Sequence, residues 1–581
     1  MSNKFEKYLV DKNDTIKKVL KVFQYTSENS LPTGIAVITD DKKEVIGVIS
    51  EGDIRRAIIG GKNINDEIID FYEKNPICIN VNLSYQEILN KIPNELSIRK
   101  RKSKKFLNNI ILVNDSGGFI KVISYNELWE QKVATHRHVV VLGLGYVGLT
   151  LGLVLSDEGF LVTGVDLDPD KITKLKNKES YVFEKGLPEL LREQSGRNFI
   201  PSSKIPNDGD VYVISVGTPV AKQKNDKKPK PVLDYIKSLS KELGKKLKPG
   251  NLVILRSTVP TGTTRNIVIP LLEEYSGLKC GHDFHLSFAP ERTAEGKALK
   301  ELRELPQIIG GVNEDSVEAT AALFRELTPT IVRVSSIEAA EMVKLINNSF
   351  RDIVFSYSNY VTQIASQYNL DIVEIIKAAN QGYPRDPVPL PSPGVGGPCL
   401  TKDPYIFSTI TNIDFNKEIS LFEYGRLINE NMHKYIVDRV ISEIGKLGKD
   451  ITDSKIFVCG LAFKGKPETG DVRNSSAVEI YHLLKHETKN ILGHDPIASA
   501  QEIKDVGVTS VEFQEGIKNS DVVLFLNNNE YYEKLDMYDV VRKMGKNPII
   551  VDGWKIFRAE DILNAKPSVY MDLSQIKKSI I

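Results

Sequence analysis

The sequence predicts an α/β protein with two open parallel sheets, joined by a long helical linker and preceded by a smaller α+β module. Three observations predict this class. A β-branched run, a glycine-rich turn and a helical pattern follow one another over residues 138–155, and a second open α/β unit, which lacks the GxGxxG pattern, begins at Ile456. Between the two units, the apolar pattern of Ile337–Ala365 predicts one long helix. Residues 1–131 contain a weak internal repeat, which predicts a separate unit.

Length, charge and cysteine content limit the classes of function. A chain of 581 residues is too long for one core, and about one domain per 150 residues predicts three or four domains. The 77 Lys and Arg nearly balance the 76 Asp and Glu, so no global field attracts nucleic acid or an anionic membrane. No apolar run approaches the ~18 residues of a membrane span, and the start has no signal-peptide core, so we expect a cytoplasmic protein. Four widely spaced cysteines predict reduced thiols and no metal site.

The N-terminal repeat has the order helix, strand, strand, helix. Its copies are Asp14–Leu20, Gly34–Asp40 and Val45–Arg56, and then Leu83–Leu89, Asn109–Asp115 and Phe119–Leu128. This doubled order resembles a tandem CBS pair, a module that senses adenine nucleotides in many enzymes. The resemblance implies that an adenine nucleotide effector binds the first copy and shifts activity or oligomeric state. The alternative is a degenerate pair that serves only as an oligomer contact.

The first copy carries the better nucleotide motif. By resemblance, Ser50 and Asp53 would bond the phosphate and ribose of the nucleotide, with Arg55 or Arg56 near the phosphates. In the second copy Glu127 stands at the position of Asp53, so we expect one nucleotide per pair.

Residues 138–155 read as a buried strand, a tight turn and a helix, with Gly143, Gly145 and Gly148 in a GxGxxG pattern. These glycines allow the turn and the close approach of a pyrophosphate, which sits at the helix N-terminus where free N–H groups favour an anion. A second strand ends at Asp166, whose carboxylate would bond the adenosine ribose and repel the 2′-phosphate of NADP. The pattern therefore predicts NAD as the cofactor. The predicted cofactor residues of this region are Gly143, Gly145, Tyr146, Val147, Gly148, Asp166, Lys171, and the strand-end hydroxyls Thr218 and Thr258.

The loop Gly394–Pro404 places one thiol, Cys399, among glycines and beside Lys402 and Asp403. The thiolate is the reactive form, and a neighbouring cation lowers a thiol pKa from about 8.5. Glycines also let a substrate approach closely. The loop therefore predicts a nucleophile, and a small buried hydrophobic residue is the alternative.

Together these motifs resemble the UDP-glucose/GDP-mannose dehydrogenase family of nucleotide-sugar 6-dehydrogenases over residues 138 to about 560. The resemblance rests on the glycine fingerprint and on five further motifs in order, which are 257–260, 288–296, 338–348, 394–404 and 460–464. It implies two Rossmann-like domains and oxidation of C6 of a UDP-sugar to the uronic acid, for surface polysaccharide precursors. An alcohol must lose two hydrides to become an acid, so the aldehyde-level intermediate has to be held, and a thiolate does this covalently. Cys399 would form a thiohemiacetal and then a thioester.

The resemblance also assigns the other catalytic roles. Lys344 would stabilise oxyanion charge, Asp403 would assist proton transfer through a water, and Glu291 would activate the hydrolytic water. Thr258 and Asn348 would complete the hydrogen bonds around C6. The alternatives without a catalytic role are a solvated lysine at 344 and a helix-capping acid at 291. The apolar neighbours of Lys344 favour a catalytic role for it.

By the same resemblance, Arg473 faces the cofactor and Arg385 reaches the partner's substrate across a dimer, so we expect a homodimer or a higher homo-oligomer. The substrate contacts implied are Glu295, Lys344, Asn348, Arg385, Gly396, Gly397 and Lys464. The domains expected are a tandem CBS module at 1–134, an NAD-binding Rossmann domain at 135–330, a helical linker and dimerisation domain at 331–430, and a UDP-sugar-binding Rossmann-like domain at 431–581.

Two departures from the family pattern leave the sugar open. Trp554 stands where UDP-glucose enzymes usually have arginine, and Pro398 precedes the cysteine where histidine or serine is usual. The glycine lead-in and Asp403–Tyr405 favour UDP-N-acetylglucosamine or UDP-N-acetylmannosamine, and UDP-glucose is the alternative.

Two other hypotheses are an enzyme that stops after one oxidation and a nucleotide-sensing protein built on an inactive dehydrogenase. An intact Cys399 argues against both.

Overall fold

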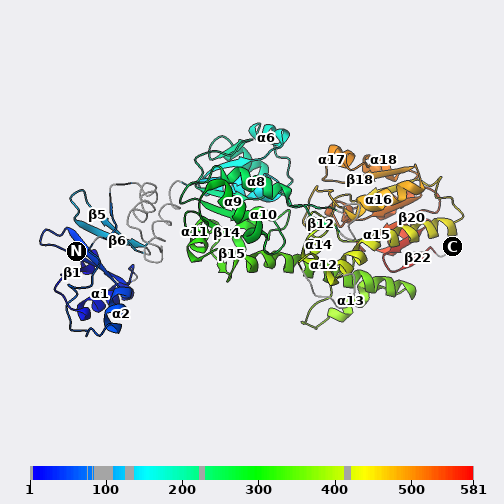
Figure 1. The fold of residues 1–581 in the computed structure, drawn as a ribbon. Coiled ribbons are helices and arrows are strands. Elements are labelled where there is room, and N and C mark those ends of the chain that lie inside the picture. Colours follow the sequence, from blue (N-terminus) through cyan, green and yellow to red (C-terminus); the bar gives the residue numbers. More distant parts are fainter. Residues whose placement is uncertain are drawn as a thin grey trace.

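The computed structural model describes residues 4–29, 31–74, 76–81, 83, 109–124, 137–221, 229–410 and 420–579. Three bodies follow one another along the chain, the N-terminal module, a first parallel-sheet unit and a second one that helix α12 connects to the first (Figure 1). The predicted fold class is confirmed by this arrangement.

The N-terminal module repeats one three-stranded pattern. Its elements are η1 (Lys4–Tyr8), β1 (Leu9–Val10), α1 (Ile16–Glu28), β2 (Ile35–Thr39), β3 (Val45–Ser50), α2 (Glu51–Ile59), β4 (Cys78–Asn80), β5 (Asn109–Val113) and β6 (Phe119–Ser124). In each half the first strand pairs parallel with the second and the second antiparallel with the third. The register shifts at the same place in both, between Ile38 and Thr39 and between Leu112 and Val113. The strands therefore confirm the internal repeat.

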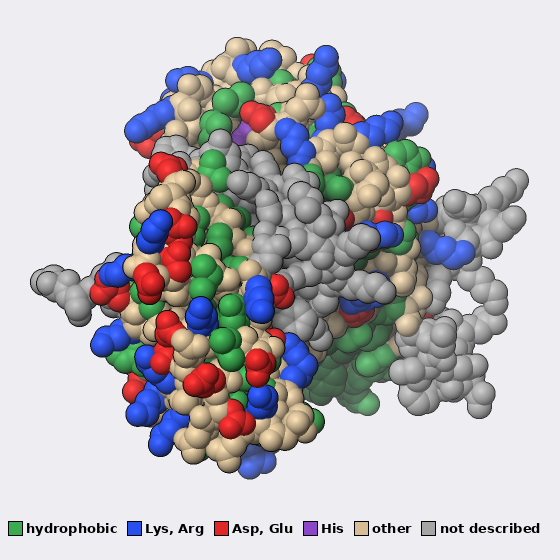
Figure 2. All heavy atoms as spheres, turned by 60° about the vertical axis from the view of Figure 1, so that its left-hand side comes forward, with side chains coloured by type: hydrophobic (Ala, Val, Ile, Leu, Met, Phe, Trp, Pro, Cys, Tyr) green, Lys and Arg blue, Asp and Glu red, His purple; other side chains and the backbone are tan. Residues whose placement is uncertain are grey.

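The two halves meet through the turns of their antiparallel pairs. The backbone N–H of Val45 donates to the carbonyl of Gly117, and that of Phe119 to the carbonyl of Lys43, each at 3.1 Å. On the face in Figure 2, which brings this side of the molecule forward, acidic and basic side chains are interspersed. The helices predicted for the second copy lie outside the described residues.

The first sheet has eight strands within 137–221 and 229–333, in the order β16-β15-β14-β13-β10-β7-β8-β9, and its strands pair parallel except for β14 with β15. Its strands are β7 (His138–Leu142), β8 (Leu161–Val165), β9 (Phe199–Ser202), β10 (Val211–Ile214), β13 (Leu252–Leu255), β14 (His285–Phe288), β15 (Gln307–Gly311) and β16 (Ile331–Arg333), and the hairpin β11 (Val220–Ala221) and β12 (Lys230–Pro231) lies outside it. Its helices are α5 (Tyr146–Asp157), α6 (Pro169–Lys176), α7 (Leu187–Gln194), α8 (Asp234–Gly244), η3 (Thr264–Val268), α9 (Ile269–Ser276), α10 (Ala298–Glu304) and α11 (Glu314–Arg325). The strand order reverses between β7 and β10, and ligands of open α/β sheets bind at such a point.

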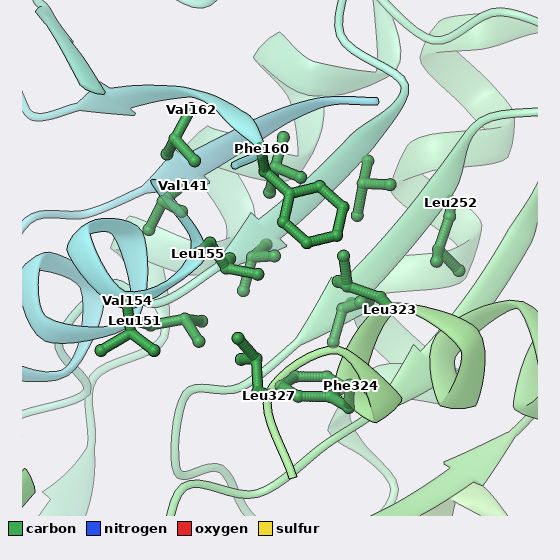
Figure 3. Close-up of a cluster of buried hydrophobic side chains, with 14 of the residues drawn as sticks. Val141, Leu151, Val154, Leu155, Phe160, Val162, Leu252, Leu323, Phe324 and Leu327 are labelled. Atoms are coloured by element: carbon green, nitrogen blue, oxygen red, sulfur yellow. The ribbon is translucent and has the colours of Figure 1, made fainter. Parts of the chain in front are cut away.

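Alternate residues of the central strands face two different cores. Val139 and Val141 of β7 belong to one buried cluster, and Val140 and Leu142 belong to another. Strands covered on both faces read as continuous apolar runs, which is why the sequence shows no alternation there. Figure 3 shows the first cluster, where Leu151, Val154 and Leu155 of α5 face strand residues and α11 side chains.

Four helices connect the two sheets: α12 (Ile337–Gln367), α13 (Ile372–Asn380), α14 (Asp403–Ser408) and α15 (Leu421–Lys446). The Ser336 hydroxyl caps α12 by accepting a bond from the N–H of Ala339 at 3.1 Å. The predicted long helix is therefore confirmed. Helices α12 and α15 pack along each other, and α14 packs against both.

The second parallel sheet has the order β18-β17-β19-β20-β21-β22, in which only β22 pairs antiparallel. Its elements are β17 (Ile456–Cys459), α16 (Ser476–Glu487), β18 (Ile491–His494), α17 (Ala500–Asp505), α18 (Phe513–Ile517), β19 (Val522–Phe525), α19 (Glu530–Glu533), α20 (Met537–Lys543), β20 (Ile549–Asp552), α21 (Ala559–Leu563), β21 (Val569–Asp572) and β22 (Ile576–Lys578). Cys459 is fully buried in β17, as a packing residue would be. Among the described helices, none combines the length and the apolar character that crossing a membrane requires.

Candidate active site

One pocket of about 540 Å³ connects the glycine turn after β7 with the cysteine loop before α14. Its walls come from strand ends of the first sheet, from α12 and from the loop of Cys399, and Arg473 of the second sheet unit completes them. The predicted residues that line it are Gly143, Gly145, Tyr146, Val147, Asp166, Lys171, Thr218, Thr258, Glu291, Glu295, Lys344, Cys399 and Arg473. Residues from 143 to 473 in the chain thus share one cavity.

The glycine turn has the shape that a dinucleotide needs. Gly143 has φ +94°, and a Cβ there would lie 2.9 Å from the carbonyl oxygen of Ser215. A Cβ on Gly148 would lie 1.9 Å from the carbonyl oxygen of Gly143, so the turn and α5 touch directly. Gly145, which caps α5 and lines the pocket, has nothing within 4 Å of its Cβ position. The start of α5, at Gly145, Tyr146 and Val147, therefore lines the pocket, where the first N–H groups of a helix can bind a pyrophosphate.

Asp166 lies at the end of β8, beside this turn. Its carboxylate accepts bonds from the N–H of Leu144 at 2.8 Å and from that of Asp168 at 3.0 Å, and Lys171 Nζ lies 3.4 Å from it. These contacts hold the carboxylate at the pocket wall, where a ribose hydroxyl could donate to it. The structure thus groups Asp166 and Lys171 at one end of the pocket.

The strand-end threonines bond each other across the sheet. Thr218 Oγ1 donates to the carbonyl oxygen of Thr258 at 2.5 Å, and Ser257 Oγ donates to that of Val216 at 2.7 Å. Both threonines are buried and line the pocket between the glycine turn and the cysteine loop.

Lys344 of α12 is a buried cation that faces the acid Glu291. Its Nζ lies 3.6 Å from Glu291 Oε2, and both side chains are at most a tenth exposed. Burial by itself lowers the pKa of Lys344, but the charges of nearby acids, Glu291 first, outweigh it and the pKa is raised. Lys344 therefore remains an ammonium ion at neutral pH, and its burial argues against the solvated-lysine alternative.

Asp403 is the first residue of α14 and is fully buried. Its carboxylate accepts bonds from Asn348 Nδ2 and from Lys402 Nζ, each at 2.6 Å. Its backbone N–H donates to the carbonyl of Cys399 at 2.9 Å, which closes a turn around the cysteine. Asn348 lies one helical turn after Lys344, so both reach the loop from one face of α12.

The Cys399 thiol has a raised pKa, contrary to the direction expected from its cationic neighbours. The side chain is open to the pocket, yet the protein around it disfavours the thiolate. Burial raises the pKa most and Asp403 adds to this, and these effects outweigh the lowering by Lys344 and Lys402. The thiol is therefore protonated at neutral pH in the chain by itself.

Glu295 lies where the two sheet units meet. Lys464 Nζ donates to its backbone carbonyl at 2.8 Å, and Thr469 Oγ1 donates to its Oε2 at 3.4 Å. Burial, with Asp471 next, raises the pKa of Glu295 to about 7. Arg473 bonds Asp471 through Nε at 2.9 Å and lines the pocket from the second unit.

The remaining predicted sugar contacts lie elsewhere around the loop. A Cβ on Gly396 would lie 2.5 Å from the carbonyl of Asn474, and one on Gly397 would lie 2.8 Å from the Phe463 ring. These glycines thus let the loop pack against the second unit. Arg385 is exposed on a loop and does not line the pocket of its own chain.

Sequence reasoning missed Arg256, which directly precedes the Ser257–Thr258 strand end. Its buried guanidinium lines the pocket, and Nη1 donates to the carbonyl of Ala289 at 3.1 Å and to Gln307 Oε1 at 2.9 Å. Burial lowers its pKa to about 10. Its position could have revealed it, because Arg256 lies at the carboxyl end of β13 and directly precedes the predicted strand-end residue pair Ser257 and Thr258.

The indole of Trp554, one of the two departures from the family pattern, forms a hydrogen bond with the backbone of the second sheet unit. Trp554 Nε1 donates to the carbonyl of Leu526 at 2.9 Å. The next residue, Lys555, bonds Asp371 of the α12–α13 connection and lies 3.5 Å from Asp572. Lys555 therefore ties the second sheet unit to the linker helices.

The predicted nucleotide residues of the N-terminal module form a local capping box. Ser50 Oγ accepts the N–H of Asp53 at 3.3 Å, and Asp53 Oδ2 accepts the N–H of Ser50 at 2.8 Å. Arg56 bonds Asp53, and Arg55 lies 3.4 Å from Glu51. Capping explains Ser50 and Asp53 without a ligand.

The fold and the pocket define a dinucleotide-dependent dehydrogenase with a cysteine at the far end of its cofactor site. Family models match three consecutive regions: the NAD binding domain of the UDP-glucose/GDP-mannose dehydrogenase family at 137–328, its central domain at 338–431 and its UDP binding domain at 457–559. A CBS domain model matches residues 6–60.

Relatives agree with these models. The chain is 30% identical over 418 residues to the UDP-N-acetyl-D-mannosamine dehydrogenase of Methanococcus aeolicus, covering 71% of this chain and 90% of that protein. The solved UDP-D-ManNAc dehydrogenase of Pyrococcus horikoshii superposes with a TM-score of 0.67 at 29% identity, over 75% of this chain and 99% of that one. A UDP-glucose dehydrogenase from Pyrobaculum islandicum superposes with a TM-score of 0.66 at 25% identity, over 76% and 98% of the two chains.

The chain belongs to the UDP-glucose/GDP-mannose dehydrogenase family. It is an NAD-dependent UDP-sugar dehydrogenase with a CBS domain at its N-terminus.

Proposed function

We propose that this enzyme oxidises C6 of a UDP-N-acetylhexosamine, UDP-N-acetylmannosamine first among them, to the uronic acid. The observation that carries the proposal is the single pocket with the glycine turn at one end and Cys399, Lys344 and Glu291 at the other. The names of the relatives support mannosamine. UDP-glucose stays the alternative, because a UDP-glucose enzyme superposes about equally well. The product would serve surface polysaccharide synthesis.

The first oxidation turns the C6 alcohol into an aldehyde. The glycine turn would hold NAD through its pyrophosphate, and the bound cofactor would accept the hydride from C6. The hydroxyl proton leaves toward Asp403 through a water, and Lys344 stabilises the alkoxide that forms. Asn348 holds the Asp403 carboxylate through its 2.6 Å bond, and Thr258 offers a further hydrogen bond near C6.

Cys399 then holds the aldehyde. Its S–H adds across the carbonyl, with sulfur bonding C6 and the proton going to O6, so the protonated thiol that the structure favours needs no external base. A second hydride from C6 would pass to a second molecule of NAD, and the O6 proton would leave toward Asp403 through a water, which gives the thioester. Water activated by Glu291 then attacks C6, the C–S bond breaks, and the carboxylate leaves while the thiol is restored.

The UDP half of the substrate belongs to the second sheet unit in this proposal. Lys464 faces the sugar and Arg473 the cofactor, with Glu295 between them. The corresponding domain bounds are 1–134, 135–330, 331–430 and 431–581.

The decisive experiment measures NADH formed per nucleotide-sugar consumed. The substrates are UDP-N-acetylmannosamine, UDP-N-acetylglucosamine, UDP-glucose, UDP-galactose and GDP-mannose, tested with the wild type and with Cys399→Ser. Two NADH per sugar, lost in the variant, is the expected result. One NADH per sugar, or wild-type turnover by the variant, would reject the cysteine mechanism, and no turnover of any sugar would favour the sensing protein.

We also propose a homodimer through α12. Large apolar side chains spaced along one face of this helix are exposed: Phe350, Tyr357, Tyr360 and Ile364. Exposed apolar patches of this kind mark interaction sites, and Leu421 and Tyr424 of α15 extend this one. Sedimentation should show a dimer that Tyr357→Glu disrupts and Lys434→Glu, on an exposed site of α15, does not. A monomeric wild type would contradict the dimer.

Finally, we propose that an adenine nucleotide binds the N-terminal module at Ser50, Asp53, Arg55 and Arg56. Binding would open the capping box, because the ribose and the helix start compete for the Asp53 carboxylate. Titration calorimetry with AMP, ADP and ATP should give heat with the wild type and none with Asp53→Asn. Glu502→Ala breaks the corresponding capping box of α17 and should leave binding intact. If the wild type gives no heat of binding with any of the three nucleotides, the proposal is wrong.

A further inference from the structure

A buried arginine on α15 holds the cysteine loop from behind. Arg426 is 1% exposed, and its Nη1 donates to Asp352 Oδ1 of α12 at 2.7 Å and to the carbonyl oxygen of Val395 at 3.1 Å. Val395 lies four residues before Cys399. A guanidinium buried this deeply is costly unless its partners stay in place, so these bonds constrain the backbone at Val395.

The same helix also contacts the segment after the cysteine. Glu430, one turn beyond Arg426, accepts from Arg426 Nη2 at 3.3 Å and from Tyr405 Oη at 3.3 Å. Tyr405 belongs to α14 and follows Asp403 by two residues. Helix α15 therefore holds the loop on both sides of Cys399.

Two asparagines extend this network to the start of the loop. Asn429 Nδ2 donates to Asp352 Oδ1 at 2.9 Å, and Asn359 Nδ2 donates to Asn429 Oδ1 at 2.9 Å. The backbone N–H of Ser392 donates to Asn359 Oδ1 at 2.9 Å. Asp352, Asn359 and Asn429 are fully buried. The loop is thus tied to α12 at Ser392 as well as at Val395.

Asp352 lies on the same face of α12 as two proposed catalytic residues. Lys344, Asn348 and Asp352 follow one another at intervals of four, about 6 Å along the helix for each step. Lys344 faces Glu291, Asn348 bonds Asp403, and Asp352 bonds Arg426. One rigid helix therefore carries the cation at the reacting centre and the anchor of the loop that brings the thiol.

We propose that Arg426, with Asp352, is a positioning residue that fixes the backbone before Cys399 so that Sγ stays opposite Nζ of Lys344. The proposal rests on the proposed function of Cys399 as the nucleophile. Neither Arg426 nor Asp352 lines the pocket, so both act on the chemistry only through the loop. Arginine suits the position because its planar fork donates to a carboxylate, a carbonyl and a second acid together, which a single ammonium does not do.

The test uses the full-length enzyme and two variants. Arg426→Lys keeps the charge but removes the fork, and Arg426→Met with Asp352→Asn removes both charges, so neither is left unpaired in the core. The matched control is Arg439→Met, because Arg439 of the same helix donates to the carbonyl of Asp572 at 2.6 Å, away from the loop. The readouts are kcat and KM for sugar and NAD, and the rate of alkylation of Cys399 by iodoacetamide against pH. Cys399→Ser gives the background of the other cysteines.

Arg426→Lys should lower kcat by about tenfold to a hundredfold, because small misplacements of reacting groups have effects of this size. KM for NAD should change by less than about twofold, and the pH midpoint of alkylation should shift. The double variant should behave likewise, and Arg439→Met should match the wild type. The double variant carries the test where Arg426→Lys does not fold.

Wild-type kcat and an unchanged alkylation profile in either folded Arg426 variant would overturn the proposal. An equal loss in Arg439→Met would do the same, because it would show a general effect of disturbing α15. Failure of the proposed function would appear separately, as a wild type that oxidises no sugar. The alkylation profile would still decide whether Arg426 positions the thiol, since it needs no substrate.

Discussion

Glu295→Gln should remove a pH dependence of stability that Glu295 creates at the junction of the two sheet units. Burial, with the charge of Asp471 second, raises the pKa of this carboxyl from 4.5 to about 7, although Arg473 and Lys464 act in the other direction. The folded protein therefore holds a proton that the unfolded chain releases between these two pH values.

The sign and size of the effect follow from this difference. Ionising this carboxyl costs more free energy in the folded protein than in the unfolded chain. The free energy of unfolding therefore falls as the pH rises from 4.5 to about 7 and stays low above that. At roughly 1.36 kcal/mol for each pKa unit, the loss amounts to about 3 kcal/mol. Glutamine carries no charge at any pH, so the variant should lack this slope.

In a Trp129→Phe background, which leaves Trp554 of the second unit as the one tryptophan, urea unfolding followed by its fluorescence measures the effect at about pH 5 and about pH 8. The wild type should lose about 2.5 kcal/mol more than Glu295→Gln between the two, because at pH 5 the unfolded carboxyl is already mostly ionised. Glu304→Gln, at an exposed acid of α10, is the control and should keep the wild-type slope. A slope in Glu295→Gln equal to that of the wild type would refute the reasoning.

Three further predictions concern the pocket. Lys344→Met should lower kcat by about a hundredfold to a thousandfold, as loss of one oxyanion-stabilising group does, with NAD affinity retained in fluorescence titrations; a loss under tenfold would contradict its role. Gly148→Ala should prevent stable folding of the NAD unit, since its Cβ would lie 1.9 Å from the carbonyl of Gly143, whereas Gly145→Ala should fold and raise KM for NAD. Asp166→Asn should weaken the preference for NAD over NADP in paired kcat/KM measurements, and an unchanged ratio would count against its ribose contact.

Local sequence patterns were sufficient for the elements of the fold. The β-branched run at β7 followed by glycines predicted strand, turn and helix, because turn geometry needs glycine at Gly143 whatever surrounds it. The same holds for α12, because its apolar pattern lies within the helix and its capping residue, Ser336, directly precedes it. The glycine turn, Asp166 and the strand-end threonines were selected from local patterns at strand ends, whereas the resemblance to the family assigned Lys344, Glu291 and Arg473.

Electrostatic states were not predictable in this way. The sequence places Lys402 next to Cys399 and suggests a low thiol pKa, but the burial and the Asp403 charge that raise it depend on how α12, α14 and the loop pack. The raised pKa of Glu295 was not predictable from its neighbours in the sequence, because Asp471 and Lys464 belong to a unit that lies far along the chain. Ser50 and Asp53 were assigned to a nucleotide motif by resemblance, and only the structure shows that they form the capping bonds of α2.

The sequence by itself determined the α/β class, the NAD fingerprint and the glycine-rich loop around Cys399, because each depends on residues within a few positions of one another. Only the tertiary structure decided which distant groups meet: Lys344 with Glu291, Asn348 with Asp403, and Arg426 with Val395. The physical reason is that charge interactions and buried hydrogen bonds act through space over a few ångströms, and the chain brings such partners together only when its helices and sheets pack.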